Sequence, residues 1–501
     1  MKYYLTTPLY YVNDQPHLGH VYTTVAADCL ARYARMKDYQ TFFLTGTDEH
    51  GQKVAEAAVR NGCQVQDLVQ RMSEAYKKLW EEMEISYDRF LRTTEPSHQN
   101  VVQKVFSRLL QQKDIYPGEY RGWYCVHEEN YVNPLTVENQ RLCPDCHRPV
   151  KEIAEPSYFF RLSAYQKKLQ DYILSHPEFV KPDFRRNEVL NFLSRGLLDL
   201  SVTRQNVSWG IPSPTPEGYP VYVWFDALLN YLSGVGYLQE KETFEKFWPP
   251  DVQLIGKDII RFHHLIWPAI LMALDLPLPR TIFAHGWWMV NREKMSKSLG
   301  NVISPPEILK NYGSCALRYF LMREVPFGLD GEYSEDTFRK RYNSDLANDL
   351  GNLVNRTINL VEKKCCGRIP QGQTDDFARL TEEIYHLYQG KMESLAFSEA
   401  LEAVWRLITF LNKFLDEKAP WRNKGEESAR SLRTVLEGIK KIAVFLSPFM
   451  PKTCRNIYRM LGNKSDPTTC KLTAIFSPLE TGQQLGPRFI LFPRKISEAD
   501  L

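Results

Sequence analysis

Residues 16–20 of the chain read Pro16-His17-Leu18-Gly19-His20, and they follow an apolar run, Tyr3–Val12, that predicts a β-strand. Apolar residues then recur at every fourth position, which predicts one buried helical face: Val21, Val25, Cys29 and Tyr33. A helix that begins near Leu18 directs free N–H groups and a partial positive charge toward the loop, which suits phosphate. The two histidines can donate hydrogen bonds to phosphate oxygens, and the glycine between them permits close approach.

A second stretch, Lys294-Met295-Ser296-Lys297-Ser298, places two lysines and two serines around a turn, which predicts a cationic loop with hydroxyl donors. Each stretch alone has a simpler interpretation. Histidines near a helix start are often caps or surface residues, and a lysine–serine run is often a solvated turn. Both stretches in one chain, in this order and far apart, resemble the two signature sequences of the class I aminoacyl-tRNA synthetases.

The composition is that of an ordinary globular protein: 501 residues, 43% hydrophobic and 25% charged, enough for about two to four domains. The net charge of +3 neither requires nor excludes a nucleic acid partner. The 10 cysteines are irregularly spaced and predict no disulfide framework. Because the N-terminus lacks a signal-peptide pattern and no apolar stretch could span a bilayer, we expect a cytoplasmic protein with no membrane association.

The first part of the chain predicts a parallel α/β sheet. The apolar run Gln40–Leu44 leads into a polar segment that contains Asp48, at the kind of strand end where open parallel sheets place ligands. Asp48 is therefore a candidate binding acid, although an Asp in this position is also a common N-cap, here for a helix near Val54–Arg60. Two further segments predict helices that cover the sheet: Val65–Met83 and Ser97–Lys113.

The sheet pattern resumes near Tyr219, where three segments predict strands: Tyr222–Leu228, Val252–Asp258 and Thr281–His285. The first leads into a helix that carries Tyr231. The second ends in Gly256-Lys257-Asp258, and Ile259, His263 and Trp267 follow at four-residue steps on one helical face. Such a face is more often core than ligand pocket, but the polar turn at its head favours a pocket.

A candidate zinc knuckle lies between these two parts of the sheet. Cys143-Pro144-Asp145-Cys146 has the spacing of such a site, in which thiolates hold a tetrahedral ion, and Cys125 is a third candidate ligand. The fourth ligand is left open among His127, Glu128 and His147. The alternative is a metal-free knuckle whose cysteines only pack.

The last third of the chain predicts a helical bundle, with helices near Asp376–Lys391, Ser398–Lys418 and Ser428–Leu446. Before them, one helical stripe is apolar and another is polar, the latter formed by Asn348, Asn352 and Arg356. Pro420 ends one helix, and Trp421 next to it could stack on an RNA base, or instead cap the bundle core. Phe489–Phe492 predicts a docking strand.

Four segments resemble the methionyl-tRNA synthetase family more closely than the class as a whole: Tyr3–Gly51, Trp224–Trp267, His285–Ser298 and Gly351–Trp421. The resemblance implies a Rossmann-type parallel-sheet catalytic domain interrupted by a connective insertion, followed by an all-α helical-bundle anticodon-binding domain. The expected ranges are 1–114 and 216–290 for the catalytic domain, 115–215 for the insertion, 291–335 for the lysine–serine loop with a stem-contact segment, and 336–501 for the bundle.

The resemblance also implies site residues. Those for methionine are Leu9, Tyr11, Asp48, Trp224, Ala227, Leu228, Tyr231, Ile259, His263 and Trp267. Those for ATP are His17, Gly19, His20, Gly256, Lys257, Asp258, Lys294, Ser296 and Lys297, of which His17, His20, Lys294 and Lys297 would be catalytic. Those for the anticodon are Asn352, Arg356 and Trp421, and those for zinc are Cys125, Cys143 and Cys146.

The reaction that the resemblance implies is ATP-dependent ligation of methionine to methionine tRNA, initiator and elongator, through methionyl-adenylate. ATP would carry Mg²⁺. Thioethers pack well against aromatic rings, and a carboxylate can hold the substrate ammonium. The chemistry of the residues assigned to methionine binding therefore suits that substrate. The sequence departs from the family at Leu18, a harmless apolar exchange, and at Glu128, which replaces a common cysteine. Because the chain ends soon after the bundle, we expect a monomer.

Three alternatives have specific weaknesses. Synthetases for valine, isoleucine or leucine carry an editing domain that is large beside the 115–215 insertion, and a cysteine enzyme would be expected to hold zinc at its catalytic site. A different nucleotidyltransferase would share the first signature but leaves the lysine–serine loop unexplained. A non-catalytic tRNA-binding paralogue would be expected to have lost signature residues that this chain retains.

Overall fold

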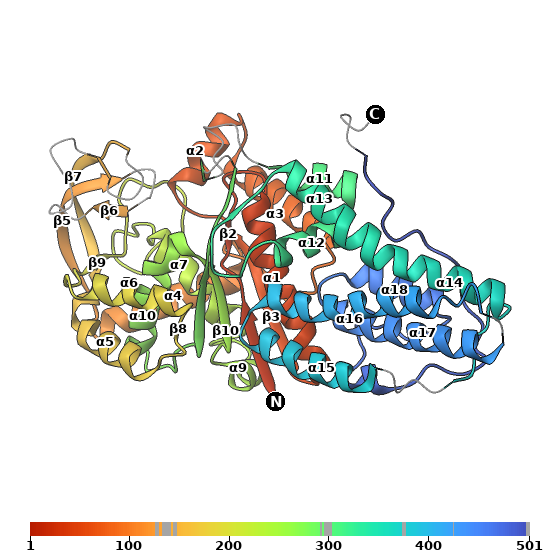
Figure 1. The fold of residues 1–501 in the computed structure, drawn as a ribbon. Helices are drawn as coiled ribbons and strands as arrows, with labels where there is room; N and C mark the ends of the chain where they lie inside the picture. The colour runs from red at the N-terminus through yellow and green to blue at the C-terminus, as the bar shows by residue number, and fades with distance from the viewer. Residues whose placement is uncertain are drawn as a thin grey trace.

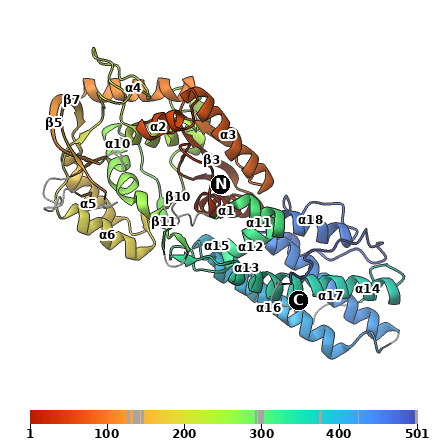
Figure 2. The ribbon, with the colours of Figure 1, turned by 90° about the horizontal axis from the view of Figure 1, so that it is seen from above.

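A computed structural model describes residues 1–125, 130–132, 142–143, 148–290, 293–294, 303–372, 377–423 and 425–496. The molecule is elongated, with a strand-rich insertion at one end, a helical bundle at the other and the main sheet between them (Figures 1 and 2). Among the helices of these ranges, none combines the length and the apolar character needed to cross a bilayer.

The main sheet has seven strands, all parallel, in the order β2-β3-β1-β10-β11-β8, with β4 beside β3. The strands are β1 (Lys2–Thr6), β2 (Tyr10–Tyr11), β3 (Gln40–Asp48), β4 (Arg89–Arg92), β8 (Val180–Lys181), β10 (Val252–Gly256) and β11 (Thr281–His285). The strand expected at Tyr3–Val12 is therefore two strands, because the chain leaves the ladder at Thr7-Pro8 and proline has no N–H to donate.

Helices cover both faces of this sheet (Figure 1). They are α1 (Leu18–Met36), α2 (Gln52–Arg60), α3 (Val65–Glu82), α4 (Pro96–Gln111), α9 (Lys241–Phe247) and α10 (Trp267–Ala273). The strand expected at Tyr222–Leu228 is wrong: Val223–Leu228 forms helix α7, and Asn230–Ser233 forms α8. An apolar run this short fits either a strand or a buried helix. In the structure it is a helix, and Asp226 within it is bonded to residues of other segments, as described below.

The insertion holds a four-stranded antiparallel sheet in the order β6-β5-β7-β9. Its elements are β5 (Ile115–Cys125), β6 (Asn130–Val132), β7 (Lys151–Phe160), α5 (Gln166–Ser175), α6 (Asp183–Leu193) and β9 (Leu200–Ser201). The expected 115–215 range is not uniform, because β8 lies within it and pairs with β11 of the main sheet. The inserted chain thus returns to the catalytic sheet before it ends.

A small sheet leads into the lysine–serine loop. It has the order β13-β12-β14, formed by β12 (Trp288–Val290), β13 (Glu293–Lys294) and β14 (Gly331–Glu332). Helices α11 (Pro305–Tyr312) and α12 (Ser314–Arg323) lie between β13 and β14 in the sequence. Residues 295–302 lie outside the described part of the chain.

The bundle begins with α13 (Glu335–Arg341), which continues as a π-helix (Tyr342–Gly351) and then as α14 (Asn352–Lys364). Its other helices are α15 (Ala378–Glu393), α16 (Phe397–Lys418), α17 (Glu426–Leu446) and α18 (Pro451–Met460). The docking strand expected at Phe489–Phe492 is wrong. The tail near it docks through side chains instead: Tyr342 donates to the Pro493 carbonyl, and Asn343 exchanges hydrogen bonds with the Lys495 backbone.

One hydrophobic core runs without a break from a face of the main sheet into the bundle. It includes Val25 of α1, Leu317 of α12 and Leu436 of α17. A second core on the other face of the sheet includes Tyr231 and Trp267. The catalytic and helical parts are therefore packed as one body along α1 and α12.

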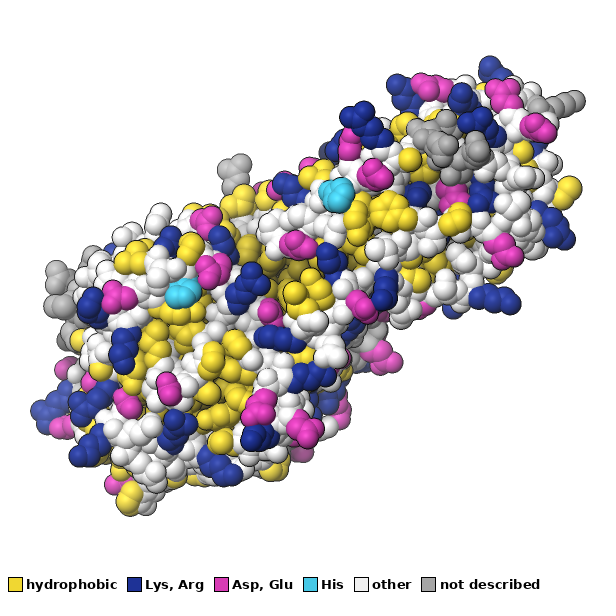
Figure 3. All heavy atoms as spheres, turned by 90° about the horizontal axis from the view of Figure 1, so that it is seen from below, with side chains coloured by type: hydrophobic (Ala, Val, Ile, Leu, Met, Phe, Trp, Pro, Cys, Tyr) yellow, Lys and Arg dark blue, Asp and Glu magenta, His cyan; other side chains and the backbone are white. Residues whose placement is uncertain are grey.

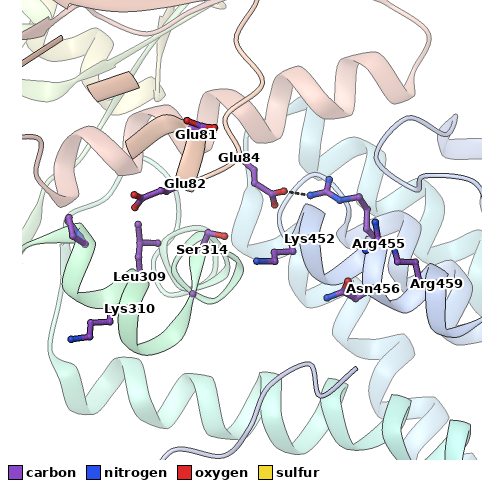
Figure 4. Close-up of a pocket in the computed structure, with 12 residues that line it drawn as sticks. Glu81, Glu82, Glu84, Leu309, Lys310, Ser314, Lys452, Arg455, Asn456 and Arg459 are labelled. Carbon is purple, nitrogen blue, oxygen red and sulfur yellow. Dashed lines mark hydrogen bonds and ion pairs between the residues drawn. The ribbon is translucent and has the colours of Figure 1, made fainter. Parts of the chain in front are cut away.

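A buried guanidinium, that of Arg318 in α12, joins these parts. It donates to Asp28 of α1 at 2.6 Å, to the carbonyls of Pro448 and Phe449 after α17 at 2.7 and 2.8 Å, and to the Met83 carbonyl at 3.2 Å. Beside it, a charged cleft of about 740 Å³ separates the end of α3 from α18, and Arg455 pairs with Glu84 across it (Figure 4).

Candidate active site

The candidate site lies at the carboxyl ends of β1, β3, β10 and β11. The chain leaves β1 toward β3 on one side, whereas β10 and β11 follow on the other, so the strand order reverses between β1 and β10. Ligands of open parallel sheets bind at such a switch point. The first signature, the Asp48 segment and the Gly256-Lys257-Asp258 turn all end at this edge.

His17 and His20 form a stacked pair at the N-terminus of α1, with ring centroids 3.7 Å apart. The His17 Nδ1 accepts from the Gly19 N–H at 3.1 Å, and the His20 Nδ1 accepts from the His17 N–H at 3.3 Å. Each Nδ1 is therefore an acceptor, which leaves Nε2 as the donor of each ring. A Cβ at Gly19 would lie 3.0 Å from the His17 ring, so the glycine makes room for this pair.

Aromatic residues hold His20 from behind. The Tyr10 ring lies 4.9 Å from the His20 ring, and the Tyr76 hydroxyl lies 3.0 Å from the His20 Nδ1. Burial, and secondarily the neighbouring His17, shift the pKa of His20 well below its ordinary value. His20 is thus a neutral hydrogen-bond donor at physiological pH rather than a cation.

Asp48 ends β3 and is 7% exposed. It is not the N-cap of α2, because Gly51 occupies that position. The segment around it is anchored on one side by Glu49, whose carboxylate accepts from Arg92 at 2.7 Å and from Thr94 at 2.5 Å. The His50 N–H points at the Asp48 Oδ1 from 3.4 Å. Asp48 thus projects from a segment with little freedom to move.

Three residues expected to bind methionine, from the second half of the catalytic domain, form one aromatic cluster: Tyr231, His263 and Trp267. The Tyr231 hydroxyl donates to His263 Nε2 at 2.7 Å, while the His263 Nδ1 donates to the Ile259 carbonyl at 3.0 Å. The Trp267 ring lies 5.5 Å from the Tyr231 ring. Burial lowers the pKa of His263 to about 3, so this imidazole stays neutral.

The helix that carries these residues is irregular. A 3₁₀ turn, Lys257–Ile259, precedes a π-helical turn, Phe262–Ile266, and α10 begins only at Trp267. Such π-turns often occur at functional sites because they redirect side chains. Phe262, which sequence reasoning missed, stacks on Trp224 with ring centroids 3.7 Å apart. No spacing in the sequence signals this pair.

The remaining expected methionine residues line the same region. Ala227 and Leu228 of α7 are buried, and Leu9, Tyr11, Trp224 and Ile259 are half-buried and pack against the core that contains Tyr231 and Trp267. Half-buried apolar residues beside a buried cluster can still contact a ligand. Seven of the ten expected residues therefore lie in or against one core, His263 is bonded to Tyr231 within it, and Asp48 lies at the carboxyl end of β3.

Two side chains of the Gly256-Lys257-Asp258 turn bind residues that follow β11 in the sequence. Lys257 pairs with Asp330 at 2.6 Å and lies over the Trp287 ring, whose Nε1 donates to Asp258 at 3.0 Å. Burial would raise the pKa of Asp330, yet the bond from Lys257 and the Trp287 N–H together lower it. The turn and the segment after β11 thus form one polar wall of the site.

Several expected residues lie outside the described part of the chain. Ser296 and Lys297 are among them, and of Lys294 only the backbone is described, in β13, where it pairs with Met289. Cys146 and the three candidates for a fourth zinc ligand, His127, Glu128 and His147, also lie outside it.

Cys125 and Cys143 are buried in one small cluster with Val132 and Val150. Two thiols together at the end of β5 fit part of a zinc knuckle. Within the described ranges, no group of three His, Cys, Asp or Glu side chains could hold a metal ion.

Two of the three expected anticodon residues, Arg356 and Trp421, lie beside each other, and Asn352 lies about one turn before Arg356 on α14. The Arg356 guanidinium lies 5.3 Å from the Trp421 ring centre and pairs with Asp416 at 2.8 Å. Trp421 is 37% exposed and Asn352 is exposed, so both side chains can be reached from solvent. An exposed ring beside a guanidinium and an amide is suited to stack and read an unpaired base.

Two cavities lie away from this site. The charged cleft beside Glu84 shares no residue with it. Another cavity, of about 770 Å³, lies at the amino ends of β1, β10 and β11. Hydrophobic side chains gather there in a hollow between the catalytic part and the helical bundle (Figure 3). Neither cavity contains a residue expected to bind ATP, methionine or the anticodon.

Family models match nearly the whole chain. One described as tRNA synthetases class I (M) matches residues 3–154 and 148–358, and one described as anticodon binding domain of methionyl tRNA ligase matches residues 367–501. The methionine–tRNA ligase of Caldanaerobacter subterraneus subsp. tengcongensis is 46% identical, over 100% of this chain and 80% of that protein. The methionine–tRNA ligase of Thermotoga maritima is 45% identical, over 93% of this chain and 76% of that protein.

Solved structures agree with these matches. Mycobacterium tuberculosis methionyl-tRNA synthetase in complex with methionyl-adenylate superposes with a TM-score of 0.93 at 39% identity, covering 99% of this chain and 100% of that chain. The apo form of the same protein gives a TM-score of 0.87 at 36% identity, covering 99% of each chain.

Proposed function

Because the chain belongs to the methionyl-tRNA synthetase family, we propose a role in the methionine–tRNA ligase reaction for each residue of the site described above. The enzyme activates methionine with ATP to give methionyl-adenylate and pyrophosphate. It then transfers the methionyl group to the 3′-terminal ribose of methionine tRNA, initiator and elongator. Membership of this family argues against valine, isoleucine, leucine or cysteine as the amino acid substrate and against a purely tRNA-binding role.

His17 and His20 donate to the phosphates of ATP. Their Nδ1 atoms accept from backbone N–H groups, so Nε2 is the donor of each ring. Donors fixed in this way need no rearrangement when negative charge grows on the phosphates, which is how preorganised sites stabilise a transition state. Gly19 lets the phosphates approach the start of α1.

Asp48 binds the substrate ammonium, and the aromatic cluster binds the thioether. A buried carboxylate forms a strong, charge-assisted hydrogen bond to an ammonium group. Tyr231, His263 and Trp267 give the sulfur polarisable neighbours, and Trp224 with Leu9, Tyr11, Ala227, Leu228 and Ile259 completes the wall. A neutral His263, fixed by Ile259 and Tyr231, adds no charge to an apolar pocket.

Gly256, Lys257 and Asp258 line the adenosine side of ATP, and Lys294, Ser296 and Lys297 contact its phosphates. The methionine carboxylate attacks the α-phosphorus in line, and pyrophosphate leaves. The chain supplies positioning and charge rather than covalent chemistry. Mg²⁺, bound to the ATP phosphates, neutralises part of their charge.

Asn352, Arg356 and Trp421 read the anticodon of methionine tRNA. Cys125, Cys143 and Cys146, with a fourth ligand from the same insertion, would hold a structural zinc ion, which would stabilise the fold of that insertion. Metal analysis of the purified enzyme tests this: about one zinc per chain is expected, and a Cys143→Ser variant should lose it. We further propose that the enzyme is a cytoplasmic monomer. The domain ranges given above also remain predictions, except that β8 belongs to the catalytic sheet.

The observation that carries these roles is the stacked pair of histidines at the start of α1, at the switch point of the sheet. ATP–pyrophosphate exchange with each amino acid in turn tests them. Exchange should require methionine, and His17→Ala or His20→Ala should each slow it by about 10²–10³-fold while the KM for methionine stays within about twofold. Exchange at the wild-type rate in both variants would refute the assignment.

A further inference from the structure

A buried His–Asp–His cluster lies behind the methionine site, and the proposed mechanism does not use it. Asp226 of α7 accepts from the His50 Nδ1 through one carboxylate oxygen and from the His98 Nε2 through the other, each at 2.7 Å. The His98 Nδ1 is in turn 2.7 Å from the Ser233 hydroxyl of α8. We call these three residues, His50, Asp226 and His98, the buried triad.

The buried triad is sealed from solvent. Asp226 and His98 are 0% exposed and His50 is 3% exposed. Among the described residues, no lysine or arginine pairs with Asp226, and the two imidazoles supply the contacts to both of its oxygens. Burial alone would raise the pKa of Asp226, yet the two histidines lower it overall. A carboxylate kept ionised in a dry interior is costly unless its partners are fixed.

The buried triad joins segments that the fold brings together from far apart. His50 belongs to the segment after β3 that carries Asp48, Asp226 lies in α7 between Trp224 and Ala227, and His98 lies in the first turn of α4. Asp48 comes from the half of the sheet before the insertion, whereas α7 comes from the half after it. Asp226 is therefore a direct polar link between the ammonium side and the thioether side of the site.

The Asp48 segment is fixed from both sides. On one side Glu49 is bound by Arg92 and Thr94 of the β4 end. On the other side His50 is bound by Asp226, while its own N–H points at the Asp48 carboxylate. Two further side chains hold the segment: the Trp209 Nε1 donates to the Glu49 carbonyl at 2.6 Å, and the Thr93 hydroxyl accepts from the Glu49 N–H at 2.9 Å. The bond from His50 to Asp226 joins the segment to α7, so removing it allows Asp48 to shift relative to α7.

We propose that Asp226, through His50 and supported by His98, is a positioning residue that holds the Asp48 carboxylate at a fixed place relative to the thioether pocket. It contacts neither ATP nor methionine. This inference rests on the proposed role of Asp48 as the ammonium ligand. A displacement of about 1 Å in such a ligand is enough to weaken substrate alignment by large factors.

The test measures the KM for methionine and the KM for ATP separately, by ATP–pyrophosphate exchange with the full-length enzyme. Asp226→Asn places an amide donor against a histidine donor and should raise the KM for methionine on the order of tenfold. The KM for ATP should stay within about twofold. His98→Gln, which weakens the support from behind, should shift the KM for methionine in the same direction by a smaller factor.

Asp345→Asn serves as the matched control. Asp345 is also a buried carboxylate, bound by Tyr319 at 2.6 Å and by Arg341, but it lies in the helical bundle. This variant should lower the melting temperature and leave the KM for methionine unchanged. If Asp226→Asn behaves like Asp345→Asn, with stability lost and no separation of the two KM values, the positioning role is refuted.

A double-mutant cycle separates this inference from the role of Asp48. If Asp226 acts through Asp48, then Asp226→Asn should add no further increase in KM on an Asp48→Asn background. Additive effects would overturn the inference and leave the assignment of Asp48 standing. If Asp48→Asn alone leaves the KM for methionine unchanged, the proposed ammonium site falls, and this inference with it.

Discussion

The buried pair of Asp28 and Arg318 should be a major source of stability between the catalytic and helical parts. Both side chains are 0% exposed, and their nearest atoms are 2.6 Å apart. Burial alone would raise the pKa of Asp28, yet the guanidiniums of Arg32 and Arg318 and the hydrogen bonds from Ser86 lower it to about 2 from 3.8. A shift of this size corresponds to about 2 kcal/mol in favour of the folded state.

The sign of this contribution is set by a pKa that is lower in the folded state. The contribution is fully present above about pH 4, and it is lost as the pH falls toward about 2, where the carboxyl becomes protonated in both states. Asp28→Asn should cost more than this, about 3–5 kcal/mol at pH 7, because it leaves the Arg318 guanidinium buried without a counter-charge. The variant thus tests the charge and the desolvation together.

Urea unfolding followed by circular dichroism measures this loss. The difference between the wild type and Asp28→Asn should be largest at pH 7 and should shrink as the pH approaches about 3. Asp38→Asn is the control, because Asp38 also pairs across the two parts, with Lys471, but at an exposed surface, and it should not move the midpoint detectably. A loss below about 1 kcal/mol for Asp28→Asn, or one independent of pH, would refute the reasoning.

Three other outcomes are expected. Lys297→Ala should slow adenylate formation by about 10²-fold or more while methionine affinity holds, and unchanged pyrophosphate exchange would contradict its assignment. Trp421→Ala should weaken tRNA charging and spare adenylate formation; equal loss of both, measured with tRNA and by exchange, would contradict base stacking. Tyr231→Phe should leave the His263 Nε2 without its donor and lower the free energy of unfolding by about 1–3 kcal/mol, and urea unfolding that shows no loss would contradict this hydrogen bond.

Segments with a clear period or a clear polar end could be predicted from the sequence. Thr281–His285 is a strand with the expected bounds, and Val65–Glu82 is a helix within one residue of them. The ten residues expected to bind methionine could be predicted only through the family resemblance, because apolar spacing alone describes a core and a pocket equally well. The structure adds the hydrogen bonds that fix His263 and Tyr231.

Features decided by contacts between distant segments could not be predicted. The helix at Val223–Leu228 was expected as a strand because its apolar run suits both, and the histidines that partner Asp226 lie in other parts of the sequence. For the same reason the buried triad had no sequence signal, although His50 stands two residues from Asp48. The π-turn at Phe262–Ile266 is equally hidden, since its residues have ordinary helical spacing.

The centre of the main sheet has a consequence for how the chain is made. Leu5 of β1 pairs with Val252 of β10, so the middle of the sheet can form only after the whole insertion has left the ribosome. Until then the nascent β1–β3 half keeps an open hydrophobic edge, which invites pairing with other chains. Slow folding follows from such distant pairing, and chaperone dependence during synthesis should therefore be governed by the time needed to translate the insertion.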